Sequence, residues 1–279
     1  MSLHQTLSEF YPPKPTFTEK NLSDLSGKVY LITGGTSGIG LALAKILYSR
    51  NAKVYITSRT DASAEKAIAG IKESTKSSSG EMRYLTTDLS DLDTIAPAIK
   101  SFLAQETLLH TVWFNAGVMQ VPKGSKTKQG YELQWGTNVV AHFLIQQLLL
   151  PILLSTAQVA PKGRVRVVWV SSDGHIHFSP KPDGIDWKDI GKKPAGWEGE
   201  KGSMTYYGQS KVGNVLLAME LAKRYGERDI VGVVSCISSQ LRTSLINIHL
   251  VLESGTLEDE SPTAYGWVYN PAFWRISTT

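Results

Sequence analysis

Short apolar runs alternate along the chain with segments in which apolar residues recur at the spacing of one helix face. The run Val29–Thr33 stops at a group of glycines, and apolar residues then recur from Ile39 to Leu47 with helical spacing. This unit of strand, tight loop and helix repeats. Further strands are predicted at Lys53–Thr57, Met82–Thr86, Thr111–Phe114, Val165–Val170 and Ile230–Val234. The other predicted helices are Ala62–Ser74, Leu92–Gln105, Tyr131–Leu150 and Tyr207–Arg224.

This alternation predicts the fold class. Short apolar strands joined by helices imply βαβ crossovers, which build a parallel sheet covered on both faces. We therefore expect a doubly wound α/β Rossmann fold with a sheet of about six to seven strands. No internal repeat or second domain is evident, so a single domain is assigned to 27–245.

Three stretches do not follow this alternation of strands and helices. The start, 1–26, contains Pro12, Pro13 and Pro15 and is predicted to be an extended arm, whereas 246–279 is an atypical segment with weak periodicity. The stretch 173–204 is rich in Gly, Pro, Lys and Trp. A long insertion within a compact domain is usually functional, so we interpret it as a lid.

Composition restricts the partners and the compartment. With 42% hydrophobic and 19% charged residues, the chain of 279 residues can bury a substantial core. The net charge is +4, but Lys and Arg are scattered, which indicates a solvated surface rather than a nucleic-acid partner. Cys236 is the single cysteine, which excludes an intrachain disulfide and a cysteine-based zinc site. A reducing compartment, the cytoplasm, is expected.

Neither the N-terminal segment nor the most apolar stretch of the chain predicts membrane association. Residues 1–20 lack the basic start and apolar core of a secretory signal. The most apolar stretch, Val139–Leu154, is interrupted by polar residues and Pro151 and is too short to span a bilayer comfortably. We interpret it as a buried helix and expect no membrane span.

The segment Thr33–Gly40, with the sequence TGGTSGIG, lies where the first predicted strand turns into the first helix. Glycines there let the backbone approach a pyrophosphate, whose charge the helix N-terminus stabilises. A purely structural turn is the alternative, but the position within a repeated βαβ pattern favours a dinucleotide site. The expected dinucleotide contacts are Gly34, Thr36, Ser37, Gly38, Ile39 and Gly40.

The end of the second predicted strand indicates which dinucleotide to expect. NAD-binding proteins tend to place an acid there, beside the ribose hydroxyls. Here Ser58 and Arg59 occupy the position, and a guanidinium suits a 2′-phosphate, with the serine as a second donor. We therefore expect NADP(H). A solvated surface arginine is the alternative for Arg59, and the nearby Asp61 keeps NAD(H) open.

Asp88 and Leu89 follow the third predicted strand. The Asp88 carboxylate could lie beside the adenine amino group of the cofactor. It could equally cap the helix predicted to begin near Asp91.

Tyr207 and Lys211 open a predicted helix, and their i, i+4 spacing places phenol and ammonium on one face. A tyrosine with a pKa near 10 is only about 0.1% phenolate at pH 7. A neighbouring ammonium and a bound nicotinamide cation both favour phenolate, and lowering the pKa by about three units requires about 4 kcal/mol. Tyr207 is therefore a candidate proton donor to a carbonyl and acceptor from an alcohol. The pair alone is common in helices and does not exclude a structural role.

Four motifs in sequence order make the chain resemble the short-chain dehydrogenase/reductase family from about Gly27 through Leu245. They are Thr33–Gly40, Asn115-Ala116-Gly117 after the fourth strand, Ser171-Ser172 after the fifth, and Tyr207 with Lys211. The segments Thr137–Leu144 and Tyr207–Val215 are most similar to the retinol-dehydrogenase-like and protochlorophyllide-reductase-like branch. That branch includes many fungal reductases of secondary metabolism.

The resemblance implies a role for each catalytic residue. Ser172 would orient and polarise the substrate carbonyl, and it is preferred over Ser171 because the family usually uses the second serine. Lys211 would bind the nicotinamide ribose and lower the pKa of Tyr207. Asn138 would hold a water in the proton relay. Asp88 and Leu89 are expected to contact the cofactor from their place after the third strand. The resemblance implies further cofactor contacts at Asn115, Ala116, Gly117, Tyr207, Lys211 and Thr243.

The chain departs from the family after the sixth predicted strand. The family has a Pro-Gly pair beside the nicotinamide, whereas this chain has Ser238-Ser239, so the backbone before Thr243 should run differently. The tail after Thr243 is short for this branch. We expect the final strand and the substrate-pocket helix to be reduced, rearranged or supplied by another subunit.

The leading hypothesis is an NADP(H)-dependent oxidoreductase that exchanges, by resemblance, the pro-S hydride with a hydrophobic small molecule. Phe178, Trp187 and Trp197 of the predicted lid favour such a substrate, although packing alone could explain them. His175 and His177 lack further ligands for a metal site, so no metal is expected. Family members often assemble through two long helices, which implies a homodimer or homotetramer.

Two alternatives use the same residues. One is an isomerase or cyclase that uses Tyr207 and Ser172 without net redox, and the other is a cofactor-binding protein without turnover. The retained catalytic residues favour an enzyme, whereas Ser238-Ser239 and the short tail favour the two alternatives.

Overall fold

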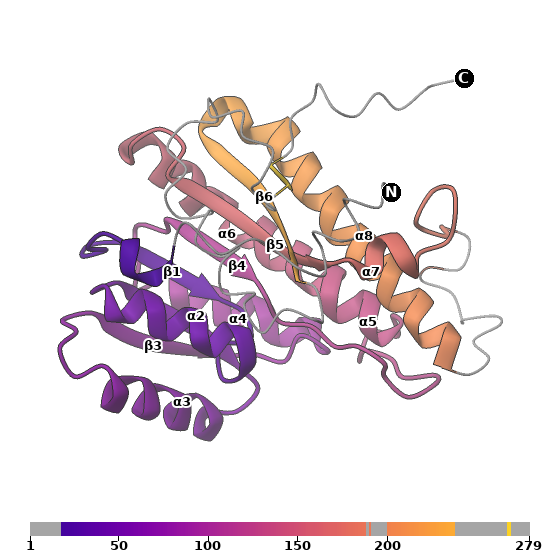
Figure 1. Cartoon of the computed structure of the whole chain (residues 1–279), viewed down its shortest axis with the longest axis horizontal. Coiled ribbons are helices and arrows are strands. Elements are labelled where there is room, and N and C mark those ends of the chain that lie inside the picture. The colour runs from indigo at the N-terminus through magenta and orange to yellow at the C-terminus, as the bar shows by residue number, and fades with distance from the viewer. Residues whose placement is uncertain (1–17, 188–189, 191–199, 238–266, 269–279) are drawn as a thin grey trace.

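In the computed structural model, which describes residues 18–187, 190, 200–237 and 267–268, strands and helices alternate along the chain (Figure 1). The strands are β1 (Val29–Ile32), β2 (Lys53–Ser58), β3 (Glu81–Thr86), β4 (Thr111–Phe114), β5 (Val165–Ser172), β6 (Ile230–Ile237) and β7 (Trp267–Val268). They form one sheet in the order β3-β2-β1-β4-β5-β6-β7, with β1 to β6 parallel and β7 antiparallel to β6. The doubly wound α/β fold is confirmed, and its strand order reverses between β1 and β4, where such sheets bind ligands.

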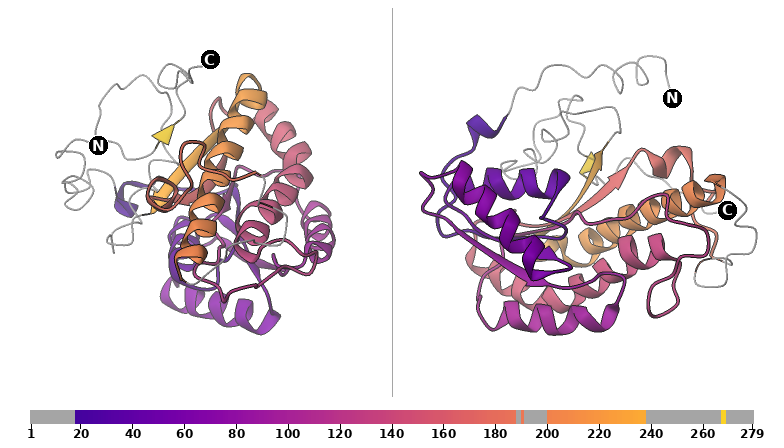
Figure 2. Two further views of the ribbon diagram at one scale, coloured as in Figure 1. Left: turned by 90° about the vertical axis from the view of Figure 1, so that its right-hand side faces the viewer. Right: turned by 90° about the horizontal axis from the view of Figure 1, so that it is seen from below.

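Helices cover both faces of the sheet (Figure 2). They are α2 (Gly38–Ser49), α3 (Asp61–Ser74), α4 (Ile95–Leu103), α5 (Leu133–Trp135), α6 (Ala141–Val159), α7 (Gly174–His177) and α8 (Glu200–Tyr225). Short 3₁₀ turns lie at η1 (Glu19–Asn21), η2 (Leu92–Thr94) and η4 (Gly226–Arg228), and η3 (Gly136–Val140) is a π-helix.

Each face of the sheet has its own apolar core. Leu31 of β1 packs in the core beneath α4, α6 and α8, whereas Tyr30 and Ile32 pack in the core beneath α2 and α3. This division follows from the alternation of side chains along a strand. Leu22 and Leu25, within the predicted N-terminal arm, are also buried in the second core. The described part of that segment therefore packs against the domain.

Helix α6 continues past Pro151, so the predicted end at Leu150 was wrong. Pro151 is exposed, whereas Leu149, Ile152 and Leu153 are buried. The ring of a proline removes one main-chain hydrogen bond, but the buried face continues at helical spacing on both sides of it. Burial of that face outweighs the missing bond.

Helix α8 begins at Glu200, so the prediction that Tyr207 opens the helix was also wrong. The first turns of α8 and the short α7 both fall inside the predicted lid, which is therefore not one continuous loop. The Gln134 side chain donates to the carbonyl oxygen of Ser203 at 2.8 Å, and Ser203 is buried. This contact with a distant part of the chain anchors the early start of α8.

One helix in the described part of the chain, Leu133–Val159, is long and apolar enough to cross a membrane by length and composition. This helix is longer than the apolar stretch Val139–Leu154 within it, so its length alone does not exclude a membrane span. Half of its most apolar window is buried inside the protein, and α6 packs against α4. We interpret this segment as the core helix of the second half of the fold.

Candidate active site

The glycine loop between β1 and α2 has the geometry that its sequence predicts. Gly34 has a φ of 69°, a left-handed conformation that favours glycine. A side chain at Gly40 would collide with the Gly34 carbonyl oxygen and the Asn115 amide. Ser37 is exposed at the N-terminus of α2, and its side chain makes no capping hydrogen bond. The loop thus presents backbone N–H groups and a hydroxyl where a helix favours an anion.

Hydrogen bonds join this loop to the segment after β4. The Thr33 hydroxyl accepts from the backbone N–H groups of Asn115 and Ala116, both at 3.0 Å. The Asn115 side chain donates to the Thr33 carbonyl oxygen at 3.0 Å. A Cβ on Gly117 would lie 3.1 Å from Asn138 Oδ1. The predicted motif after β4 therefore connects the glycine loop with the residues near α8.

The end of β2 exposes the arginine that was predicted to select the cofactor. Arg59 is exposed, and no carboxylate of the described residues forms an ion pair with it. Ser58 is buried, and its hydroxyl donates to the Thr60 carbonyl oxygen at 2.8 Å. Asp61 accepts a hydrogen bond from Thr86. The guanidinium is thus available to a ligand, whereas the Ser58 hydroxyl and the Asp61 carboxylate already have partners.

Asp88 forms a local turn after β3. Its Oδ1 atom accepts from Ser90 N at 2.9 Å and from Ser90 Oγ at 2.8 Å. The following 3₁₀ turn is capped by Asp91, which accepts from Asp93 N at 3.1 Å. The alternative capping role predicted for Asp88 was therefore wrong. The Leu89 side chain is buried in the first core, so only its main chain is available to a cofactor.

Tyr207 and Lys211 lie side by side on α8. The Lys211 amine is 5.5 Å from the centroid of the Tyr207 ring and donates to the Val170 carbonyl oxygen at 2.9 Å. Burial lowers the pKa of Lys211 to about 8. Burial also raises the pKa of Tyr207, which is opposite to the lowering predicted from the lysine alone. In the protein by itself, the phenol is therefore held protonated.

The two serines at the end of β5 have different partners. Ser171 donates to the main-chain oxygen of Lys211 at 2.9 Å, so its hydroxyl attaches α8 to the sheet. The Ser172 hydroxyl is within hydrogen-bonding reach of the phenol, and its donation to the phenolate would lower the pKa of Tyr207 against the effect of burial. A Cβ on Gly174 would lie 3.0 Å from the Tyr207 ring and 3.4 Å from Ser172 Oγ. The structure thus brings Ser172, and not the hydroxyl of Ser171, to the phenol.

Asn138 lies in the π-helix that precedes α6. Its Nδ2 atom donates to the Val118 carbonyl oxygen and to Ser210 Oγ, both at 3.0 Å, and its Oδ1 atom accepts from Val118 N at 2.9 Å. Ser210 in turn donates to the Tyr207 carbonyl oxygen at 2.7 Å. The Asn138 side chain therefore joins the loop after β4 to α8. A π-turn inside a helix is frequent at functional sites.

Sequence reasoning missed two residues that contact this group. His142 Nδ1 lies 3.0 Å from the Asn138 carbonyl oxygen, and Nε2 lies 2.9 Å from the Thr33 hydroxyl. Burial lowers the pKa of His142 to about 4, so the ring is neutral at pH 7. Asp173 accepts a hydrogen bond from Ser172 at 2.8 Å. The i, i+4 spacing from Asn138 could have indicated the histidine.

Exposed apolar side chains lie on segments next to the site. Met119 follows the motif after β4, Ile176 and Phe178 lie at α7, and Trp187 is 65% exposed. The Trp187 ring meets the Trp135 ring edge to face, with centroids 6.4 Å apart. Other predicted site features, namely Trp197, Ser238, Ser239 and Thr243, lie outside the described residues.

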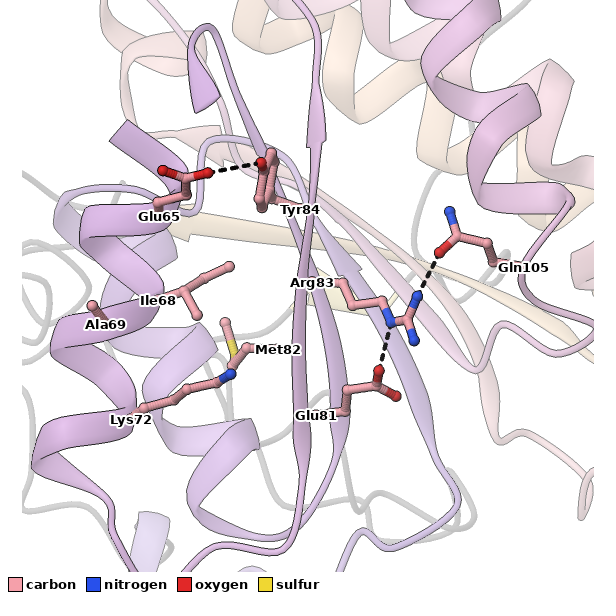
Figure 3. Close-up of a pocket in the computed structure, with 9 residues that line it drawn as sticks. All are labelled: Glu65, Ile68, Ala69, Lys72, Glu81, Met82, Arg83, Tyr84 and Gln105. Atoms are coloured by element: carbon pink, nitrogen blue, oxygen red, sulfur yellow. Dashed lines mark hydrogen bonds and ion pairs between the residues drawn. The ribbon is translucent and has the colours of Figure 1, made fainter. Parts of the chain in front are cut away.

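The described residues contain no group of three His, Cys, Asp or Glu side chains that could hold a metal ion. A hollow of about 530 Å³ lies between α3 and β3 (Figure 3). There the Arg83 guanidinium donates hydrogen bonds to the side chains of Glu81 and Gln105, both at 2.6 Å. These polar groups are therefore already hydrogen-bonded to one another. The hollow lies beside the edge strand β3, away from Tyr207.

Comparison with known proteins identifies the family of the chain. Residues 28–178 match the family model described as short chain dehydrogenase. A short-chain dehydrogenase/reductase of Phomopsis amygdali is 44% identical over 234 residues, which cover 84% of this chain and 68% of that protein. One of Neocamarosporium betae is 38% identical over an alignment of 281 positions, which covers 98% of this chain and 78% of that protein.

Solved structures show the same fold. The Pseudomonas aeruginosa RhlG/NADP active-site complex has a TM-score of 0.56 at 24% identity, covering 76% of this chain and 72% of that chain. A metagenomic short-chain oxidoreductase in complex with NADP has a TM-score of 0.60 at 22% identity, covering 82% of this chain and 92% of that chain.

Proposed function

The chain belongs to the short-chain dehydrogenase/reductase family, and from this premise we propose that it is an NADP(H)-dependent oxidoreductase acting on a hydrophobic small molecule. The observation that carries the proposal is the meeting of Tyr207, Ser172 and Lys211 at the end of β5. A proton donor, a hydroxyl beside it and a buried amine together provide what carbonyl reduction requires of a protein.

The glycine loop fits a nicotinamide dinucleotide. Gly34 takes a left-handed conformation, Gly40 leaves no room for a side chain, and Ser37 presents an uncapped hydroxyl at the N-terminus of α2. These residues would hold the pyrophosphate. Gly117, close to both Asn138 and Lys211, would line the path from the pyrophosphate toward the catalytic residues.

Bound NADPH would supply the hydride to the carbonyl carbon. Tyr207 would donate its phenolic proton to the carbonyl oxygen, and Ser172 would orient that oxygen by a hydrogen bond. Lys211 would hold the nicotinamide ribose and stabilise the phenolate that proton transfer leaves. Asn138 would hold the water through which the phenol regains its proton.

We propose NADP(H) rather than NAD(H) because of Arg59. Its exposed guanidinium has no ion pair within the described part of the chain and is suited to a 2′-phosphate. Asp61, which could support NAD(H), accepts a hydrogen bond from Thr86 instead. Two structural neighbours are described as complexes with NADP, which supports the same choice.

The hydrophobic substrate class follows from the exposed apolar side chains beside the site. Met119, Ile176, Phe178 and Trp187 come from segments that flank the catalytic residues. Solvent exposure of several large apolar side chains near one site is typical of a surface that receives an apolar ligand.

We also propose an oligomeric state and a cellular role. Phe143 of α6 and Leu216 of α8 are exposed at 43% and 40%, respectively. They lie on the two long helices through which we propose a homodimer or homotetramer. We also propose a cytoplasmic enzyme of fungal secondary metabolism, since similar proteins occur in fungi such as Phomopsis amygdali.

The direct test is incubation of the purified chain with a panel of apolar ketones and alcohols. NADPH absorbance and product mass are followed in the same reaction. Hydride transfer predicts equal amounts of NADPH consumed and of product heavier by two hydrogens. A product of unchanged mass without NADPH consumption would instead identify an isomerase or cyclase, and binding without any product would identify a cofactor-binding protein.

A further inference from the structure

Asp173 directly follows Ser172 and occupies the N-cap position of α7. Asp is a favoured N-cap residue because its side chain accepts from backbone N–H groups of the first turn. Here the side chain makes no capping hydrogen bond. Its Oδ1 atom instead accepts the Ser172 hydroxyl at 2.8 Å. Helix capping therefore does not explain why an aspartate occupies position 173.

The hydrogen bonds of Ser172 decide what its hydroxyl can do. A serine hydroxyl has one proton to donate and lone pairs that accept. Ser172 Oγ accepts from Gly174 N at 3.1 Å and donates its proton to Asp173. While the carboxylate holds that proton, the hydroxyl cannot donate it to the Tyr207 oxygen.

Asp173 also acts on Tyr207 by its charge. Burial is the largest cause that raises the pKa of Tyr207, and the negative carboxylate adds to it, whereas donation from Ser172 would lower it. The other groups facing the phenol are Lys211 on α8 and the Cys236 thiol on β6, and His175 of α7 contacts the Ser172 carbonyl oxygen. Asp173 therefore disfavours the phenolate in two ways. Its negative charge repels the phenolate, and its hydrogen bond from Ser172 occupies the proton that could stabilise the phenolate.

We propose that Asp173 is a positioning residue that holds the proton of the Ser172 hydroxyl, so that Ser172 does not donate to the Tyr207 oxygen and the phenol stays protonated. A protonated phenol is ready to deliver its proton to a carbonyl oxygen, so this arrangement favours reduction of a carbonyl over oxidation of an alcohol at neutral pH. The inference rests on the proposed function of Tyr207 as the proton donor.

The test measures the ionisation of Tyr207 without any substrate. The full chain is labelled with ¹³C at the tyrosine ring carbon that bears the hydroxyl and is titrated by NMR. Because the chain has 11 tyrosines, each protein is paired with its Tyr207→Phe counterpart to identify the signal. Asp173→Asn removes the charge and retains an acceptor, and Asp173→Ala removes both. Asp183→Asn, at an exposed position of the same segment, is the matched control.

We expect Asp173→Asn to lower the pKa of Tyr207 by about 1 unit, and Asp173→Ala to lower it further, since a nearby charge shifts a pKa by about 1–3 units. Asp183→Asn should leave it unchanged. Equal Tyr207 titration in wild type and both Asp173 variants, or a pKa raised by either, would overturn the proposal.

This result is independent of turnover. If the Asp173 variants lower the pKa of Tyr207 but no substrate is ever reduced, the positioning role stands and the proposed reductase function fails. If the enzyme reduces ketones and the variants leave the Tyr207 pKa unchanged, the function stands and the positioning role fails. With a substrate in hand, the pH profile of alcohol oxidation should move to lower pH in Asp173→Asn.

Discussion

The Lys211 amine lies 5.5 Å from the centroid of the Tyr207 ring and donates a hydrogen bond to the carbonyl oxygen of Val170 in β5. The two side chains that the i, i+4 spacing predicted on one helix face thus both point to the carboxyl end of β5. Ser171, which donates to the Lys211 carbonyl oxygen, fixes α8 against the same strand. The position of the phenol therefore depends on how α8 docks on the sheet.

The buried amine predicts a pH dependence of cofactor affinity. The pKa of Lys211 is lowered to about 8, so the amine loses its charge as the pH rises through that value. If the ammonium holds the nicotinamide ribose, NADP(H) affinity should be highest below pH 8 and should fall above it. Isothermal titration calorimetry from pH 6.5 to 9.5 measures this. Lys211→Met should bind more weakly and show no fall near pH 8, whereas a wild-type affinity independent of pH would contradict the assigned contact.

Two buried histidines predict a loss of stability in acid. The pKa values of His142 and His110 are lowered from 6.5 to about 4, chiefly by burial. The unfolded chain then binds more protons than the folded chain between pH 6.5 and pH 4, so stability is lost as the pH falls through this window. Each histidine accounts for a loss of up to about 3 kcal/mol in the free energy of unfolding over this window. Urea unfolding at pH 7, 5.5 and 4.5 should show this decline, and His142→Gln should reduce its slope.

The exposed His177 supplies the control for that measurement. His177→Gln should leave the slope of stability against pH unchanged. A wild-type stability that stays constant between pH 7 and pH 4.5 would show that the two histidines titrate normally.

Most of the fold could be predicted from local patterns. The strand Thr111–Phe114 was predicted with the bounds that the structure has, because a short apolar run between polar segments is a local signal. The start of α8 could not be predicted in this way. It depends on the contact between Gln134 and Ser203, which are far apart in the sequence.

In the candidate site, too, residues with a local sequence signal were predicted, whereas those that depend on distant contacts were missed. Tyr207, Lys211 and Ser172 were found because their residue types and spacing carry the chemistry. His142 was missed because its role depends on Thr33, a residue on the first strand, and Asp173 because an acid after a serine pair predicts no particular partner. The direction of the Tyr207 pKa was missed because burial, which opposes the lysine, comes from the whole fold.

The glycine loop predicts a steric effect at Gly40. An added methyl group would collide with the Gly34 carbonyl oxygen and the Asn115 amide, and both lie where the loop meets the segment after β4. Gly40→Ala should therefore abolish dinucleotide binding or strongly destabilise the chain. Gly70→Ala on α3 is the control, because its Cβ would meet nothing within 4 Å. It should stabilise the helix by about 0.5–1 kcal/mol. Unchanged NADPH binding in Gly40→Ala would contradict the proposed loop contact.

Arg59 predicts the cofactor preference. Arg59→Ala should weaken NADPH binding by about 1–3 kcal/mol, the scale of a charge-assisted contact, and should leave NADH binding nearly unchanged. Lys72→Ala, which removes an exposed cation on α3, should affect neither cofactor. Fluorescence titration with both cofactors measures the difference. Equal losses for NADPH and NADH in Arg59→Ala would show that the guanidinium does not contact the 2′-phosphate.

The central claim is that Tyr207 is the proton donor, and Tyr207→Phe tests it most directly because the change removes the hydroxyl and keeps the ring. Turnover of an identified carbonyl substrate should fall by about 10²–10⁴-fold, the contribution of a positioned acid, while NADPH affinity stays nearly intact. Tyr206 is adjacent in sequence but lies about 100° away around the helix, so Tyr206→Phe should have a mild effect on turnover. The measurement is the turnover rate of both variants with NADPH binding determined in parallel. A Tyr207→Phe enzyme that keeps most of its activity, while Tyr206→Phe loses it, would contradict the account.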